Sequence, residues 1–285
     1  MSIGGFPTGT GTAPHAQSQF MVEHHAELLD SLDSAQRRNL WRFRIISALV
    51  WVALVLLVGG GMWLASGAEF EFVQTSGPVI VLQGAPTTVL VSVLAITFAT
   101  ALAIIGALGR LSLNPIFSAV ASFYVSLIRG TPLLLQIYFI YFALPQLDIV
   151  LPAIQAGVTA LALNYGAYMT EIFRAGIQAV PRGQREAAQA LGMPEQLVMR
   201  RIVLPQAVRI VIPAVGNEFI AMIKDSALVS LITIHETLFL AQRIGRSAFE
   251  PTAALIIAGA VYWTLTIIFS FFQARLERRL ARSDR

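Results

Sequence analysis

Six stretches of the 285-residue sequence carry little or no charge and are each about as long as a helix that crosses a lipid bilayer. A helix rises about 1.5 Å per residue, so roughly 20 apolar residues cross the hydrocarbon core. These stretches are residues 45–66, 86–109, 115–144, 151–173, 207–234 and 252–272. Only 13% of all residues are charged, whereas a soluble domain has about 25%. The sequence therefore predicts an all-α integral membrane protein with about six transmembrane helices.

The third stretch, 115–144, is longer than one crossing and is interrupted by Arg129-Gly130-Thr131-Pro132. This segment combines a charge, a flexible residue and a helix breaker. It predicts either one long kinked helix or an interfacial helix followed by a short crossing, with Arg129 anchoring the break or binding an anionic lipid. The first stretch, 45–66, has a second interpretation as a signal peptide, but a leader of 44 residues and a full-length apolar run favour an anchor.

The distribution of charge predicts the orientation. Most of the 20 Lys and Arg residues lie before the first stretch, between the fourth and fifth, or after the last. Cations mark the cytoplasmic side, so both termini are predicted to be cytoplasmic. Residues 1–44 then form a cytoplasmic tail, expected to be mobile because it is polar, and 277–285 form a basic tail. The loop 235–250 fits imperfectly, because it is predicted to be outside and yet carries Arg243 and Arg246.

The chain lacks the residues that several kinds of chemistry need. Without cysteine it has no disulfide, no thiolate metal site and no cysteine nucleophile. Its four histidines show no metal-ligand spacing on a predicted element, so no metal is predicted; they are His15, His24, His25 and His235. No Walker A glycine–lysine loop is present, so the chain cannot cradle a nucleotide by that route.

One polar segment, residues 180–205, interrupts the apolar pattern on the predicted cytoplasmic side. Good helix formers from Glu186 to Leu191 and a following Gly192 predict a short helix with a glycine at its end. Pro194 suits the first turn of a second helix, which is predicted to end before Pro205. Some apolar residues in this segment offer a face for a partner's groove, namely Leu191, Met193, Leu197 and Val198.

Four ordered motifs resemble those of a known family. The run Glu186-Ala187-Ala188, followed by Gly192 and by Ile202-x-Leu204-Pro205, resembles the EAA signature of permease subunits of binding-protein-dependent ABC importers. The segments 128–136, 166–174 and 216–230 resemble the branch that imports polar amino acids such as glutamate, glutamine, histidine and arginine. The resemblance covers residues 82–276. It implies a type I importer core of five helices, to which residues 45–66 add one N-terminal helix.

The resemblance also implies a mechanism and a set of partners. The chain would form half of a pore in the plasma membrane of a prokaryote, with a second copy or a related permease as the other half. ABC ATPase subunits would bind the segment 180–205, and an extracytoplasmic binding protein would deliver the solute. ATP and magnesium would belong to the ATPase, so the chain itself is expected to be no enzyme and to hold no cofactor. The residues implied in coupling are Glu186, Ala187, Ala188, Gly192, Ile202, Leu204 and Pro205.

Polar residues within the apolar stretches are candidates for a solute pathway, because charge at membrane depth is costly. A zwitterionic solute needs partners of both signs. The candidates are Asn164, Tyr168, Glu171, Glu218, Lys224, Asp225, Ser226 and Ser230. Simpler interpretations compete with this one: Glu171 pairs with Arg174, Lys224 and Asp225 form structural ion pairs, and the serines pack between helices.

Two other functions compete with the ABC permease. A proton- or ion-coupled secondary transporter would use Glu171, Glu218 or Asp225 as its ion site, but no inverted repeat is evident and the polar segment 180–205 would be unexplained. A membrane-embedded hydrolase lacks a Ser/His pair and a zinc motif. The basic tail 275–285 fits an anionic lipid leaflet better than a nucleic acid.

Overall fold

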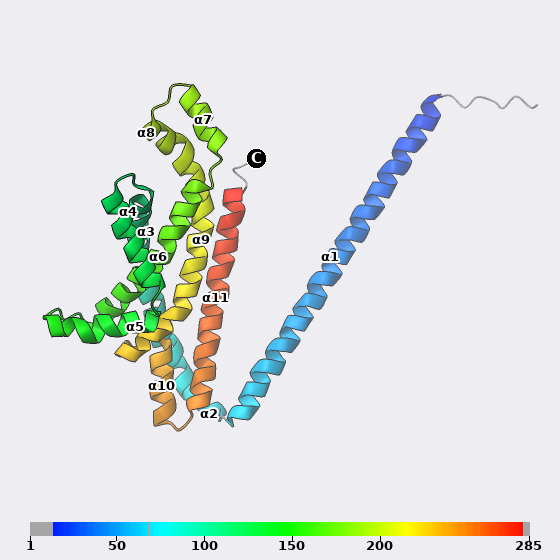
Figure 1. The fold of residues 1–285 in the computed structure, drawn as a ribbon. Helices are drawn as coiled ribbons and strands as arrows, with labels where there is room; N and C mark the ends of the chain where they lie inside the picture. Colours follow the sequence, from blue (N-terminus) through cyan, green and yellow to red (C-terminus); the bar gives the residue numbers. More distant parts are fainter. Residues whose placement is uncertain (1–13, 68, 282–285) are drawn as a thin grey trace, which may run out of the picture. The chain divides into compact units, whose positions relative to one another are not determined.

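The computed structural model describes residues 14–67 and 69–281, and these residues form helices joined by short turns (Figure 1). The chain divides into two compact units, residues 1–65 and 66–285, which are described separately. The α-helices are α1 (Pro14–Ser66), α2 (Phe70–Val79), α3 (Ala85–Leu111), α4 (Pro115–Arg129), α5 (Leu133–Tyr138), α6 (Ala153–Gln178), α7 (Arg182–Ala190), α8 (Glu195–Val198), α9 (Leu204–Asp225), α10 (Thr237–Ser247) and α11 (Pro251–Ala281). Tighter or wider helical turns join some of them: η1 (Ile80–Gly84), η2 (Phe139–Ala143), η3 (Leu144–Leu147), η4 (Met199–Val203) and η5 (Ser226–Ile232).

The described part of the first unit belongs to one helix, α1. The tail expected for residues 1–44 is therefore helical from Pro14 onward, and residues 1–13 lie outside the described part of the chain. After Pro14 the tail contains neither glycine nor proline, and good helix formers continue into the apolar run. Residues 39–65 of α1 are long and apolar enough to cross a membrane.

The described residues contain four helices that are long and apolar enough to span a membrane, or five spans if one bent pair counts as a span. Three of the four belong to the second unit: Phe70–Leu111, Glu195–Ile232 and Pro251–Leu280. These findings confirm the all-helical membrane class. The remaining predicted stretch, 151–173, corresponds to α6, which is not among these apolar helices. Its polar residues, among them Asn164 and Glu171, lower its hydropathy, and its central part is buried by other helices.

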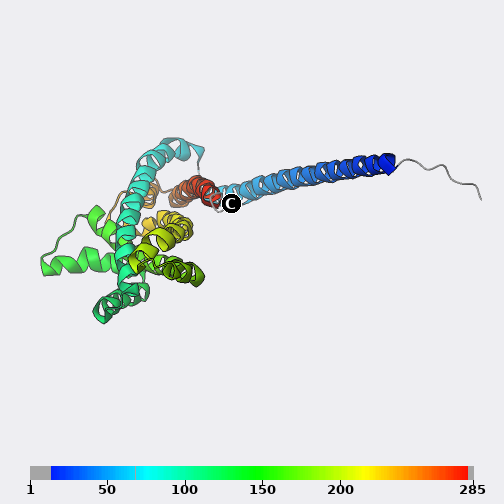
Figure 2. The same ribbon diagram turned by 90° about the horizontal axis from the view of Figure 1, so that it is seen from above.

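The bent pair is the third predicted stretch, which turns by 104° between α4 and Leu133–Leu147. The bend lies at Gly130 and Pro132, as the sequence predicted. The Gln136 side chain closes it, because its Nε2 donates to the carbonyls of Ile128 (2.8 Å) and Thr131 (3.1 Å). Backbone acceptors that the helix break leaves open are thus satisfied. Figures 1 and 2 both show α5 projecting sideways from the long helices of the second unit.

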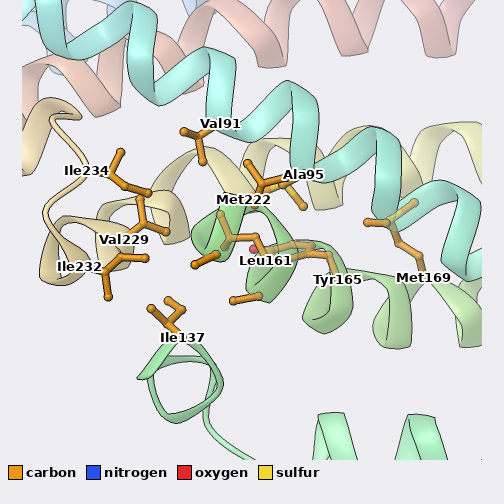
Figure 3. Close-up of a cluster of buried hydrophobic side chains, with 14 of the residues drawn as sticks. Val91, Ala95, Ile137, Leu161, Tyr165, Met169, Met222, Val229, Ile232 and Ile234 are labelled. Atoms are coloured by element: carbon orange, nitrogen blue, oxygen red, sulfur yellow. The ribbon is translucent and has the colours of Figure 1, made fainter. Parts of the chain in front are cut away.

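The core of the second unit lies between α3, α6, α9 and η5, where small residues allow close packing. A Cβ at Gly166 would lie 3.0 Å from the Cβ of Leu102 and 2.8 Å from the Tyr124 hydroxyl. Figure 3 shows the buried apolar side chains that meet there. They include Val91, Ala95, Ile137, Leu161, Tyr165, Met169, Met222, Val229, Ile232 and Ile234.

The two ends of the second unit differ. The segment with α7 and α8 lies at one end, and α10 lies at the other (Figure 1). Near α10 the fully buried Glu236 accepts hydrogen bonds from the backbone N–H of Phe239 (2.8 Å), from Thr88 Oγ1 (3.3 Å) and from the Tyr262 hydroxyl. Burial raises the pKa of the Glu236 carboxyl, although these hydrogen bonds act in the opposite direction. This group ties the start of α10 to α3 and α11.

Candidate functional site

The segment 180–205, called the coupling loop below, has an apolar core of its own. Ala188 of α7 is buried there with Ile177, Val180, Val198 and Val203. The side chains of Glu186 and Ala187 are exposed instead. Among the described residues no hydrogen bond or ion pair involves the Glu186 side chain. The Glu-Ala-Ala run therefore has one residue that shapes the loop and two that face outward.

Gly192 forms the turn that follows α7. It has a φ of +78°, a left-handed conformation that side chains with a Cβ rarely adopt. Backbone bonds close the turn: Gly192 N–H donates to Gln189 (2.9 Å), and Met193 N–H donates to Ala188 (3.1 Å). No atom lies within 4 Å of a Cβ built on this glycine. The backbone conformation, and not lack of space, thus requires glycine here.

The second half of the coupling loop differs from the prediction. The helix expected to end before Pro205 does not end, because α8, η4 and α9 follow one another without a break. The wide helical turn η4 precedes Pro205, which lies in the first turn of α9, where a missing N–H is tolerated. Val198 is fully buried in the loop core, so it cannot belong to the predicted docking face, whereas Leu191 is 84% exposed.

The other residues that the resemblance implies in coupling lie where η4 meets α9. Ile202 is half-buried and packs against the loop core, while Leu204 and Pro205 are exposed. Gln206 Nε2 donates to the Ile202 carbonyl at 2.9 Å. The loop is also fixed by Arg185, whose Nη2 donates to the Ile177 carbonyl at 3.0 Å. These contacts join the loop to the ends of α6 and α9.

A polar cavity of about 550 Å³ lies between the α4–α5 bend, α6 and α9. Two larger grooves, of about 610 and 780 Å³, have no charged residue in their linings and are poor candidates for a polar solute. The polar cavity contains four of the residues predicted for a solute pathway: Asn164, Tyr168, Glu218 and Asp225. Its lining comprises Arg129, Gly130, Thr131, Pro132, Leu133, Asn164, Tyr165, Tyr168, Glu218 and Asp225.

Side chains from α6 and the bend hold the cavity in shape. The Tyr165 hydroxyl donates to Asp225 Oδ2 at 2.7 Å. The Arg129 guanidinium lies over the Tyr168 ring, 5.0 Å from its centroid. Asn164 Nδ2 donates to Gln136 Oε1 at 3.1 Å, so the side chain that closes the bend also contacts the cavity wall. The cavity therefore presents two carboxyl groups and one guanidinium.

The remaining predicted residues lie elsewhere. Glu171 binds two arginines near the C-terminal end of α6: Arg110 at 3.1 Å and Arg174 at 2.6 Å. This is the pairing that the simpler interpretation expected for Arg174, with one further partner from α3. Arg110 in turn donates to Ser122 Oγ at 2.5 Å, so α3, α4 and α6 are joined. Lys224 is exposed and does not line the cavity.

The serines after α9 are part of the packing. Ser226 and Ser230 are both buried, and Ser226 Oγ donates to the Ile223 carbonyl at 2.7 Å. Neither lines the polar cavity. Their arrangement agrees with the interpretation that they pack between helices.

Six lining residues were not among the predicted candidates, and two of them, Arg129 and Tyr165, make side-chain contacts in the cavity wall. Arg129 was assigned to the bend or to lipid, and Tyr165 directly follows the predicted Asn164 in the sequence. The signal for Arg129 was its place at a helix break, since irregular backbone at membrane depth usually lines a cavity. Tyr165 had no comparable signal, because a tyrosine among apolar residues is ordinarily packed in a core. In the described part of the chain, no group of three or more acidic or histidine side chains is placed to hold a metal ion.

Sequence comparison identifies relatives over most of the chain. Residues 96–282 match the family described as binding-protein-dependent transport system inner membrane component. The L-cystine transport system permease protein TcyB of Bacillus subtilis is 39% identical over 77% of this chain and 94% of its own length. The arginine transport system permease protein ArtQ of the same organism is 39% identical over 72% of this chain and 94% of its own length.

Comparison with solved structures gives the same result. A crystal structure of an amino acid ABC transporter with histidines has a TM-score of 0.72 and 40% identity, with 74% of this chain and 99% of that chain covered. An inward facing MetNI methionine ABC transporter has a TM-score of 0.60 at 16% identity, over 75% of this chain and 99% of that chain, a likeness of fold alone. The protein therefore belongs to the family of binding-protein-dependent transport system inner membrane components.

Proposed function

We propose that this chain is the transmembrane permease subunit of an ATP-driven importer of polar amino acids. The observation that carries the proposal is the presence, in one helical unit, of the coupling loop and a cavity with charged groups of both signs. Relatives named for L-cystine, arginine and glutamine transport support the class of solute. Because these relatives are named for different amino acids, the comparison does not identify which amino acid this chain transports.

The cavity has the chemistry that an amino acid requires. The Arg129 guanidinium suits the solute carboxylate, because its fork of N–H donors matches two carboxylate oxygens. Glu218 and Asp225 suit the solute ammonium group, and Tyr165 positions Asp225 through its 2.7 Å hydrogen bond. Tyr168 and Asn164 complete the wall, while Glu171, Lys224, Ser226 and Ser230 act around the cavity and do not contact the solute.

The helix α9 connects the two parts of the mechanism. It begins at Leu204 in the coupling loop and ends at Asp225 in the cavity, a length of 22 residues. At about 1.5 Å per residue this is roughly 33 Å of helix. Displacement of the coupling loop by an ATPase therefore reaches the solute carboxyl groups through one rigid element. ATP and magnesium are held by that ATPase, and the exposed Glu186, Ala187 and Leu191 are the part of the loop that contacts it.

Several partners follow from this role. A second permease, identical or related, supplies the other half of the pore, ABC ATPase subunits bind the coupling loop, and an extracytoplasmic protein delivers the solute. The coupling loop then faces the cytoplasm, and both termini lie on that side. Residues 45–66 add a membrane anchor to the five-helix core, 82–276. The residues 277–285 form a basic cytoplasmic tail, of which 282–285 lie outside the described part of the chain.

The test is reconstitution with a candidate ABC ATPase and a candidate solute-binding protein. We expect a radiolabelled amino acid to accumulate in vesicles only when ATP and both partners are present. Uptake by the permease alone, driven by a proton gradient, would instead establish the secondary-transporter alternative. A catalytically inactive ATPase variant is the matched control, because it assembles without driving transport.

A further inference from the structure

One face of α10 combines aromatic rings with cations. The His235 and Phe239 rings stack with centroids 4.5 Å apart and planes at 22°, and the Arg243 guanidinium lies 6.0 Å from the centre of the Phe239 ring. Phe239 and Arg243 are four residues apart on α10 and therefore share one face, and His235 lies just before the helix, which begins at Thr237. Arg246 extends the row by one turn. His235, Arg243 and Arg246 are all exposed.

The opposite face of α10 is fixed against the rest of the unit. Leu240, Ala241 and Gly245 are buried. A Cβ at Gly245 would lie 2.7 Å from the Cβ of Ala254 on α11. The buried Glu236 also accepts a hydrogen bond from the backbone of Phe239 at the start of the helix. The basic aromatic face is therefore held in one orientation.

This face lies at the end of the unit away from the coupling loop (Figure 1). The span before α10 starts near the coupling loop and ends at Ile232, and the span after it starts at Pro251. The proposed function puts the coupling loop in the cytoplasm, so α10 is outside. Arginines outside oppose the usual distribution of charge. Within the described part of the chain, neither Arg243 nor Arg246 forms an ion pair.

An exposed aromatic residue extends the same surface. Phe249 follows α10 and is 91% exposed. Its φ is +58°, in the left-handed region that is unfavourable for a bulky residue. Backbone bonds hold it there: its N–H donates to Arg246 at 3.3 Å, and Glu250 N–H donates to Gly245 at 2.8 Å. Arginine and aromatic residues are the types enriched at the energetic centres of protein interfaces.

We propose that this surface, His235, Phe239, Arg243, Arg246 and Phe249, is the docking site for a carboxylate-bearing face of the external solute-binding protein. The inference rests on the proposed function, which requires a protein partner at this end of the permease. Unpaired guanidinium groups would bind carboxylates of the partner, and Phe249 would pack against its apolar atoms. An anionic lipid headgroup offers similar charge, so the experiment separates lipid from protein.

The experiment titrates the binding protein, loaded with its amino acid, against the permease–ATPase complex in nanodiscs of phosphatidylcholine and measures ATPase activity. For the double variant Arg243→Glu/Arg246→Glu we expect the half-maximal concentration of binding protein to rise about tenfold or more, with the same maximal rate approached at high concentration. Added salt should raise this concentration for the wild type and much less for the variant. Arg243→Lys/Arg246→Lys should stay within about threefold of the wild type.

Two further variants separate docking from folding. Phe249→Gly removes the ring and relieves the left-handed backbone, so it should fold normally and still raise the half-maximal concentration by about threefold. The matched control is Arg278→Glu/Arg279→Glu, an equal change of charge at exposed positions near the far end of α11. This control should leave the half-maximal concentration unchanged.

Each result decides one question. If the binding protein stimulates the wild type and the Arg243/Arg246 reversal equally, the docking site is wrong and the importer function stands. If the reversal has an effect only in nanodiscs that contain anionic lipid, the surface binds lipid and the inference is overturned. If the wild type is stimulated under no condition and takes up no amino acid, the proposed function fails, and the docking site fails with it.

Discussion

The coupling loop and the polar cavity are built in opposite ways. The loop is one continuous segment, 180–205, whose shape depends on backbone conformation and on small buried residues such as Ala188. The cavity is assembled from three segments, 129–133, 164–168 and 218–225, whose side chains are positioned by hydrogen bonds. Substitutions in the loop should therefore act through shape, and substitutions in the cavity should act through charge.

The largest effect is expected from a change of charge without a change of shape in the cavity. Asp225→Asn keeps an acceptor for the Tyr165 hydroxyl but removes a negative charge from the proposed ammonium site. Hydrogen bonds to charged groups contribute about 1.5–3 kcal/mol, so uptake of a subsaturating amino acid should fall roughly 10- to 100-fold. Radiolabelled uptake in reconstituted vesicles measures this effect.

Co-purification with the ATPase separates the two regions in the same variant. Because the loop is untouched, Asp225→Asn should retain its ATPase subunit in the same ratio as the wild type. Tyr165→Phe is the companion variant, since it leaves the charge and removes only the hydrogen bond that positions it; a smaller loss of uptake is expected. Equal uptake by Asp225→Asn and the wild type would exclude Asp225 from the solute site.

A change of backbone conformation in the loop should rank second. Gly192→Val places a β-branched residue at a φ of +78°, where the left-handed conformation costs roughly 1–2 kcal/mol. Solute-stimulated ATPase activity should fall about tenfold, because the turn that presents α7 is less populated. Gly192→Asn is the matched control, since asparagine tolerates this conformation and no atom lies near the added Cβ. Similar losses in both variants would mean that the surface of Gly192, and not its conformation, matters.

The same contrast explains what the sequence could predict. The loop was recognised because Glu186, Ala188 and Gly192 are close together in the sequence and glycine marks a turn locally. Its second half was predicted less well, because η4 carries the helix through Pro205, which acts as a first-turn residue and not as a stop.

The cavity was only partly predicted, because its parts meet only after folding. Asn164, Tyr168 and Glu171 follow one another at intervals of four and three residues, so they share one face of α6. Glu171 nevertheless pairs with Arg110 of α3 and does not line the cavity. Arg110 lies 61 positions before Glu171, so no local sequence pattern could predict that the two side chains are in contact. Arg129 was assigned only to the bend or to lipid, because its contact with the Tyr168 ring, 39 positions later in the sequence, also forms only after folding.

Glu171 lies on α6, which also lines the polar cavity. A substitution there tests whether this carboxylate binds solute or only stabilises the fold. Glu171→Gln removes the charge that Arg110 and Arg174 share, leaving two guanidinium groups next to a neutral amide. The free energy of unfolding should fall by about 1 kcal/mol. This is less than a buried ion pair would lose, because all three side chains are partly exposed and water screens their charges. Thermal unfolding in detergent measures this loss. The KM for solute should not change, and a raised KM with normal stability would return Glu171 to the solute pathway.

The smallest effect should come from exchanging one cation for another in the cavity. Arg129→Lys keeps the positive charge but loses the planar group that lies over Tyr168, 5.0 Å from the ring centroid. A cation–π contact contributes about 0.5–1 kcal/mol at an exposed site, so the KM for uptake should rise about two- to fivefold. Tyr168→Phe retains a ring face and should change KM less.

Arg129→Gln removes the charge itself and should raise KM further than Arg129→Lys, since the cavity is proposed to act on its solute through charge. If lysine and glutamine raised KM equally, the planar contact with Tyr168 would be the important feature of Arg129. The cavity would then depend on shape as the coupling loop does, and the contrast between the two regions would no longer hold.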